Sequence, residues 1–265
     1  MLELEDSPTP SPELNTILYF SKMIPTRIKT LLKKNKIIYR IATYLFTIFQ
    51  YIKNTPLRDY FNLERWILFS KVSPFTKVPY LRLTNTYNLA RKVERNRIDG
   101  AFVECGVWKG GCAAVMAYVA RKSTRKIWLF DSFKGLPEST KEDKNKHKIS
   151  GSLVASPDDC KKVLFNQLKL NKINIVIRKG WFRDVLPKSK PEIGKIALLR
   201  TDADWYESTK QCLENLYENV VSGGYVIIDD YGYFSGCKKA VDEFIKGKNI
   251  KINKIDGIGI FFQKP

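Results

Sequence analysis

The sequence predicts an α/β fold in which helices cover both faces of a mostly parallel seven-stranded sheet, and two observations lead to this prediction. Five short apolar runs alternate with segments of helical periodicity, as in parallel strands joined by helices. Two later runs flank Asp256-Gly257, which predicts an antiparallel hairpin with a type I′ turn. The predicted strands are residues 101–105, 126–131, 173–179, 196–201, 225–229, 250–255 and 259–263, and a helix over 85–95 precedes them.

Length and charge set the next limits. The chain has 265 residues, enough for one full α/β domain and an extension. It carries 46 Lys+Arg against 27 Asp+Glu, a formal charge of +19. Such an excess attracts nucleic acid, anionic lipid or phosphorylated substrates, although lysines scattered over solvated faces would give the same total.

Cysteine and histidine usage excludes several kinds of site. The five cysteines include no CxxC pair, so neither a disulfide framework nor a zinc site is expected. His147 is the only histidine, which excludes a multi-histidine metal site. The N-terminus is acidic and has no early apolar core, so no secretory signal is predicted. These features predict a cytoplasmic protein.

The N-terminal part has a different composition from the rest. Residues 1–20 are predicted to be a disordered tail, and residues 21–79 a basic helical extension. Residues 22–58 contain nine Lys/Arg and no Asp or Glu, and the apolar run 37–52 within them is too short to span a bilayer comfortably. This stretch is predicted to pack on the catalytic domain or a partner subunit, or to lie on an anionic inner membrane surface.

A glycine-rich turn follows the first predicted strand, in the segment FVECGVWKGG. Gly106, Gly110 and Gly111 let a backbone approach a ligand at the carboxyl end of a strand, where doubly wound sheets bind cofactors. The spacing is GxxxGG and not the GxGxxG of NAD folds. Glu104 at the strand end would repel a pyrophosphate and suits a cationic cofactor, such as the ammonium of a methionine moiety. The alternative is an ordinary tight strand–helix turn.

Two more segments are candidates for binding the same cofactor. Asp131, followed by Ser132, ends the next strand at the offset where an acid commonly holds ribose hydroxyls; the alternative is a helix N-cap. Gly180 and Trp181 follow the third strand and could form the apolar wall for an adenine, or belong to the core or a lid.

Four carboxylates follow the fourth and fifth strands, at Asp202, Asp204, Asp229 and Asp230. Because these strands are predicted to be parallel neighbours, their acids should converge at one edge of the sheet. Clustered carboxylates repel one another unless a cation joins them, and hard oxygen ligands suit Mg²⁺. The alternative is a pair of capping acids at a stabilised turn.

Five motifs together resemble the TylF/MycF/NovP family, the macrocin-type O-methyltransferases. They are DSFKGLPEST, GWFRDVLP, LLRTDADWYEST, LENLYENVVSGGYVIIDDYG and GCKKAVDEF, and they cover about residue 80 to the C-terminus. The resemblance implies that residues 80–265 form a Rossmann-like class I methyltransferase domain. It implies S-adenosylmethionine as the methyl donor, Mg²⁺, a sugar hydroxyl on a small-molecule or glycan acceptor, and a homo-oligomer.

The resemblance also implies residue roles. Asp202, Asp229 and Asp230 would be metal ligands, Asp204 a general base, and His147 an alternative base from an acceptor-side lid. The family pattern DGDLYEST is altered here, because Ala203 and Trp205 replace its Gly and Leu. The bulk of Trp205 beside the metal predicts a different acceptor, and the positive charge predicts an anionic or lipid-linked glycan.

Three other functions compete with this reading. A metal-dependent methyltransferase for catechol-like phenols would use the same acids. A nucleotide-sugar oxidoreductase is disfavoured by the GxxxGG spacing and Glu104. A non-catalytic protein using its basic arm on a membrane or nucleic acid would leave the acidic cluster unexplained. No RNA-binding signature stands out, so no nucleic-acid partner is expected.

Overall fold

The computed structural model describes residues 62–143 and 150–265. By its contacts the chain divides into two compact units, of which the second comprises residues 64–76 and 82–265 and contains every described strand. The predicted tail at 1–20, the basic stretch 22–58 and His147 lie outside the described residues. Among the residues that are described, no helix is long and apolar enough to cross a membrane.

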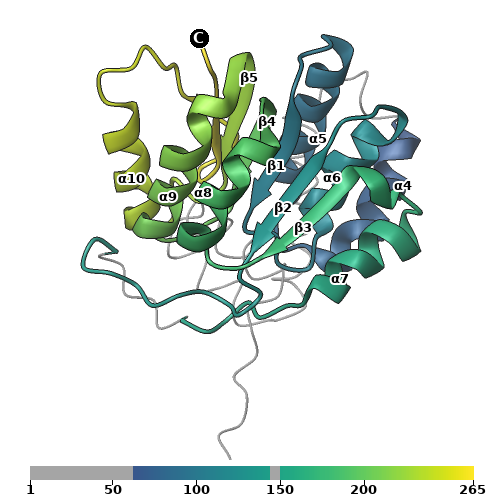
Figure 1. Cartoon of the computed structure of the whole chain (residues 1–265), viewed down its shortest axis with the longest axis horizontal. Helices are drawn as coiled ribbons and strands as arrows, with labels where there is room; N and C mark the ends of the chain where they lie inside the picture. The colour runs from purple at the N-terminus through teal and green to yellow at the C-terminus, as the bar shows by residue number, and fades with distance from the viewer. Residues whose placement is uncertain (1–61, 144–149) are drawn as a thin grey trace, which may run out of the picture. The chain divides into compact units, whose positions relative to one another are not determined.

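The second unit contains a seven-stranded sheet in the order β3-β2-β1-β4-β5-β7-β6. Strands β1 to β5 are parallel, and β7 runs antiparallel between β5 and β6 (Figure 1). The strands are β1 (Ala101–Cys105), β2 (Ile127–Asp131), β3 (Ile175–Lys179), β4 (Ile196–Thr201), β5 (Val220–Ile228), β6 (Asn253–Lys254) and β7 (Ile260–Gln263). The predicted α/β fold with one antiparallel strand is therefore confirmed.

Helices cover both faces of the sheet, as expected when the central strands are mostly apolar. Every residue of β1 and β4 is buried. In Figure 1, α8, α9 and α10 lie in front of the sheet, and α5 and α6 lie behind it. The α-helices are α4 (Leu63–Val72), α5 (Tyr80–Arg95), α6 (Gly111–Val119), α7 (Pro157–Lys161), α8 (Phe182–Ile193), α9 (Tyr206–Leu216) and α10 (Ser235–Ile245).

The C-terminal hairpin is present, but the predicted type I′ turn is wrong. That turn needs a positive φ at both central residues, and neither Asp256 nor Gly257 has one. Instead, the Asp256 carboxylate accepts the N–H groups of Ile258 at 2.8 Å and Gly259 at 2.7 Å. The loop between Ile255 and Gly259 contains three residues, one more than a type I′ hairpin has, because the Ile255 N–H bonds to the Gly259 carbonyl. The turn is therefore stabilised by hydrogen bonds from the backbone to the Asp256 side chain, and not by the backbone conformation of a type I′ turn.

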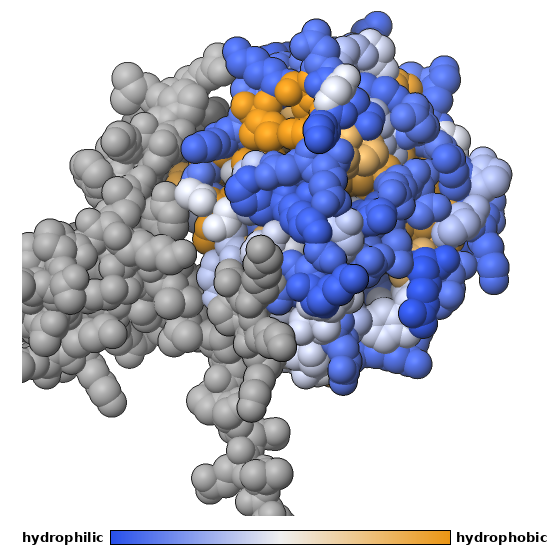
Figure 2. Space-filling view, turned by 90° about the vertical axis from the view of Figure 1, so that its left-hand side faces the viewer, coloured by the Kyte–Doolittle hydropathy of each residue, from blue (hydrophilic) through white to orange (hydrophobic). Residues whose placement is uncertain are grey.

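All five cysteines lie in the described residues, and each is a free, buried thiol: Cys105, Cys112, Cys160, Cys212 and Cys237. The absence of a disulfide was predicted from their spacing. Burial raises the pKa of the Cys112, Cys160, Cys212 and Cys237 thiols. On the face shown in Figure 2, most of the coloured surface is hydrophilic, with a hydrophobic patch near the top.

Candidate functional site

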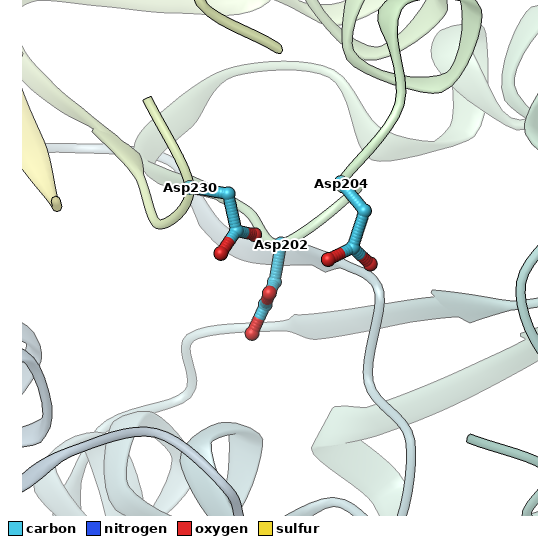
Figure 3. A group of neighbouring side chains, drawn as sticks. All are labelled: Asp202, Asp204 and Asp230. Atoms are coloured by element: carbon cyan, nitrogen blue, oxygen red, sulfur yellow. The ribbon is translucent and has the colours of Figure 1, made fainter. Parts of the chain in front are cut away.

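An acidic group lies at the carboxyl ends of β4 and β5, which are hydrogen-bonded neighbours. Asp202 follows β4, Asp230 comes two residues after β5, and Asp204 lies in the loop before α9. One carboxylate oxygen of each lies within 4.8 Å of the others, and in Figure 3 Asp230 and Asp204 stand on either side of Asp202. The structure therefore brings together three of the four predicted acids.

The fourth acid, Asp229, faces elsewhere. One of its carboxylate oxygens is paired with Arg82 and the other with Arg200. Arg82 also donates to the Asp229 backbone carbonyl at 3.0 Å. Asp229, predicted as a metal ligand, is held by two guanidinium groups outside the cluster of three.

Arg200 is the central residue of this site that sequence reasoning missed. Its side chain is completely buried. It lies 2.7 Å from Glu104 and 3.0 Å from Asp202, besides its contact with Asp229. One guanidinium therefore joins the acids at the ends of β1, β4 and β5. The available signal was a single charged residue inside the apolar run IALLRT, because a buried arginine requires partners.

Arg82 is a second missed residue, and it is contributed by α5. Its Nε lies 3.3 Å from the Asp256 carboxylate in the β6–β7 loop, and its Nη1 lies 3.9 Å from Asp230. A Cβ at Gly259 would lie 2.6 Å from the Arg82 side chain, so this glycine leaves room for it. The sequence pattern of an amphipathic helix does not show whether an arginine is buried and paired, as Arg82 is, or exposed to solvent.

Glu104, predicted to face a cationic cofactor, is almost completely buried. Its Oε1 accepts from Arg200, whereas its Oε2 has no hydrogen-bond partner among the described residues. Burial is the main reason that its pKa is raised to about 8. An unsatisfied buried carboxylate oxygen at a strand end fits a positively charged ligand group.

Asp131 ties the glycine-rich turn to the end of β2. Its carboxylate accepts the N–H groups of Val107 and Trp108, both at 2.8 Å, and that of Phe133 at 2.7 Å. The adjacent Ser132 hydroxyl accepts the Lys134 N–H at 3.1 Å. Whether Asp131 also holds a ribose stays a prediction.

The glycines of this turn are required by packing against the protein itself. Gly106 has a φ of +89°, and a Cβ there would lie 1.8 Å from the Asp202 carbonyl oxygen. Gly110 packs against Cys160, and Gly111 against the Phe75 backbone. After β3, Gly180 packs against Val185, and Trp181 is the N-cap residue of α8. The close approach of β1 to β4 at Gly106 brings the predicted cofactor turn next to the acidic group.

Trp205 corrects an expectation from the sequence. Its side chain is only 1% exposed, so it belongs to the core and adds no bulk to an open acceptor wall. Its ring packs edge-on against Phe234 at 5.0 Å, and its Nε1 donates to the Pro137 carbonyl at 2.9 Å. The argument that Trp205 sets a different acceptor therefore loses its support.

The acidic group is electrostatically unfavourable on its own. Burial first, and then repulsion from neighbouring carboxylates, raises the pKa of both Asp204 and Asp230 well above the ordinary value. Asp230 Oδ2 is buried and has no hydrogen-bond partner among the described residues. Three oxygen donors with one unsatisfied atom fit a hard divalent cation, which would relieve the repulsion.

The raised pKa values predict how stability depends on pH. A carboxyl group with a raised folded-state pKa gives stability that is complete below its unfolded pKa and is lost as pH rises through the folded one. For Glu104 this window runs from 4.5 to about 8, and the pKa values of Asp204 and Asp230 shift in the same direction. In EDTA, the melting temperature is expected to fall between about pH 5 and pH 9, and less steeply in Glu104→Gln. A melting temperature that rises over this range would contradict the assignment.

Comparison with known proteins identifies relatives over most of the chain. Residues 72–264 match the family model described as macrocin-O-methyltransferase (TylF). The 8-demethyl-8-(2,3-dimethoxy-alpha-L-rhamnosyl)-tetracenomycin-C 4'-O-methyltransferase of Streptomyces olivaceus is 35% identical over 199 residues, 71% of this chain and 75% of the relative. The mycinamicin III 3''-O-methyltransferase of Micromonospora griseorubida is 30% identical over 204 residues, 71% and 78% of the two chains.

Solved structures agree with these matches. The structure of the O-methyltransferase NovP superposes with a TM-score of 0.67 at 34% identity, covering 72% of this chain and 82% of that one. The calicheamicin methyltransferase CalS11 shares the fold, with a TM-score of 0.58 at 19% identity over 98% of this chain and 94% of that one.

Proposed function

Because the chain belongs to the macrocin-O-methyltransferase (TylF) family, we propose that it methylates a sugar hydroxyl of a glycosylated small molecule with the help of a divalent cation. The chain is an O-methyltransferase with S-adenosylmethionine as its methyl donor, as its family implies. The proposed acceptor class is supported by relatives named for a rhamnosyl tetracenomycin, demethyldecarbamoylnovobiocin and mycinamicin III.

The observation that carries the metal part of the proposal is the convergence of Asp202, Asp204 and Asp230. We assign Asp202 and Asp230 to the cation, with Asp204 beside it. When bound, a divalent cation such as Mg²⁺ lowers the pKa of an acceptor hydroxyl and holds it for attack on the methyl group. Asp229 then has a supporting role, since both of its carboxylate oxygens face arginines.

Asp204 is the proposed proton acceptor. One of its carboxylate oxygens lies within 4.8 Å of oxygens of Asp202 and Asp230, so it stands within reach of a hydroxyl held at the cation. His147 stays an alternative base from the sequence. Glu104, whose Oε2 is unpaired within the described residues, would receive the cationic end of the methyl donor, and Asp131 would accept from the ribose. Most of the rate enhancement would come from holding donor and hydroxyl in line, because the sulfonium already supplies the leaving group.

Removal of the metal tests this function directly. The purified chain is incubated with labelled S-adenosylmethionine and a panel of desmethyl glycosides that includes demethyldecarbamoylnovobiocin and mycinamicin III. Methyl transfer to a sugar oxygen, located by mass spectrometry, is expected to fall to background after dialysis against EDTA and to return with Mg²⁺. Transfer that persists at full rate in excess EDTA would exclude the cation. Transfer to catechol but to no glycoside would exclude the sugar acceptor.

A further inference from the structure

The backbone at Asp204 has an unusual conformation. Its φ is +56°, in the left-handed region that non-glycine residues rarely adopt. The Trp205 N–H donates to the Ala203 carbonyl at 2.6 Å, two residues back, which makes Asp204 the centre of a γ-turn. Such strained conformations persist only where the surrounding structure holds them. The direction of the Asp204 carboxylate therefore depends on what fixes the residues beside it.

Trp205 fixes the turn on its C-terminal side. Its indole is buried against Phe234, and its Nε1–H reaches across to the Pro137 carbonyl at 2.9 Å. Pro137 lies in the segment 135–143, which leaves the sheet after β2. The residue next to the proposed base is thus bonded to a segment more than sixty positions away in the sequence.

The next residue makes a second bond to the same segment. The Tyr206 N–H donates to Asp143 Oδ1 at 2.9 Å, at the first residue of α9. Asp143 is 2% exposed, and its other oxygen accepts the Thr140 N–H at 2.9 Å and the Thr140 hydroxyl at 3.0 Å. A Cβ on Gly236 would lie 1.7 Å from Asp143 Oδ1, so α10 leaves a gap that this carboxylate fills.

We propose that Trp205 and Asp143 are positioning residues that fix Asp204 by clamping segment 135–143 to the start of α9. The clamp consists of two hydrogen bonds made by consecutive residues, Trp205 and Tyr206. Trp205 departs from the family pattern. In this proposal it orients the Asp204 carboxylate and does not contact the acceptor. The effect on catalysis rests on the proposed function of Asp204. The clamp itself rests only on the two hydrogen bonds.

A double-mutant cycle on the full chain tests the clamp. Trp205→Phe keeps a ring against Phe234 and removes only the Nε1–H donor. Because one Asp204 oxygen lies within 4.8 Å of oxygens of Asp202 and Asp230, its negative charge also attracts the cation. Displacing it should weaken Mn²⁺ binding, measured by calorimetry, about three- to tenfold, the scale of one lost hydrogen bond. If Trp205 acts through Asp204, it should have no further effect in the Asp204→Asn background. Trp128→Phe, the same change at a buried tryptophan of β2, is the matched control and should bind as wild type does.

Two outcomes of the cycle would overturn the proposal. The effects of Trp205→Phe and Asp204→Asn could add in full, or Trp128→Phe could weaken Mn²⁺ binding equally. If the wild-type chain binds no Mn²⁺, the proposed cation fails, and hydrogen exchange then decides the clamp alone. Trp205→Phe should speed amide exchange in residues 138–143, and Asp143→Ala should speed it at Tyr206. Unchanged exchange in both places would show that no clamp exists.

Discussion

Arg200→Met is expected to lower the free energy of unfolding by about 3–5 kcal/mol, the cost of removing one partner from a buried ion pair. Methionine replaces the aliphatic part of the arginine side chain, so most of the loss comes from the buried charges that remain. Glu104 and Asp229 would be left buried at the ends of β1 and β5, and Glu104 would lose the only ion pair that it makes within the described residues. Urea unfolding followed by circular dichroism measures the difference.

Neutralising the acids should reverse part of this loss. In the triple variant Arg200→Met with Glu104→Gln and Asp229→Asn, the buried negative charge is gone, and stability is expected to recover by more than half. Arg178→Met is the matched control, because Arg178 and its partner Glu192 are both exposed, and it should cost about 1 kcal/mol or less. Equal losses of stability in Arg200→Met and Arg178→Met would show that the buried ion pairs of Arg200 contribute no more than an exposed pair.

Asp230→Asn is expected to reduce methyl transfer on the order of 100-fold, the scale reached when one preorganised charge-stabilising group is lost. Mn²⁺ binding should weaken in parallel, whereas affinity for S-adenosylmethionine should stay the same, because Glu104 and Asp131 are intact. Metal-free stability should be unchanged or higher, since the raised pKa of Asp230 shows that the fold favours its neutral form.

Asp229→Asn tests whether Asp229 supports the site through its arginine contacts or binds the cation directly. Its carboxylate pairs with both Arg82 and Arg200, so this variant should lose stability before it loses cation affinity. Asp158→Asn, at an exposed position of α7, controls for a general change of charge. If Asp229→Asn abolished Mn²⁺ binding at wild-type stability and Asp230→Asn did not, the two assignments would have to be exchanged.

Most of the fold could be predicted from the sequence because the central strands are buried on both faces. Residues 101–105 and 196–201 were predicted with the bounds that β1 and β4 have. The margins were less predictable. The strand predicted over 225–229 begins at Val220, since Gly223-Gly224 reads as a turn in isolation but continues β5 here. The strand predicted over 250–255 is reduced to Asn253–Lys254.

The acidic group could be predicted because it follows from topology alone. Acids at the ends of two adjacent parallel strands must share one edge of a sheet, and Asp202 and Asp230 do so. The arginines could not be found in this way. Arg82 is contributed by a helix outside the strand alternation, and its contacts with Asp229 and Asp256 join positions far apart in the sequence. The sequence alone could not tell that Asp229 pairs with these arginines while Asp230 lies beside Asp202 and Asp204.

The buried thiols have a practical consequence for following residues 135–143 in solution. All five cysteines are enclosed by the fold, so maleimide reagents should leave the native chain unmodified. A cysteine introduced at the exposed Lys141 would then carry a fluorophore or spin label without any background substitution. The mobility of that label would report how this segment responds when donor and acceptor bind, with the natural cysteines left in place.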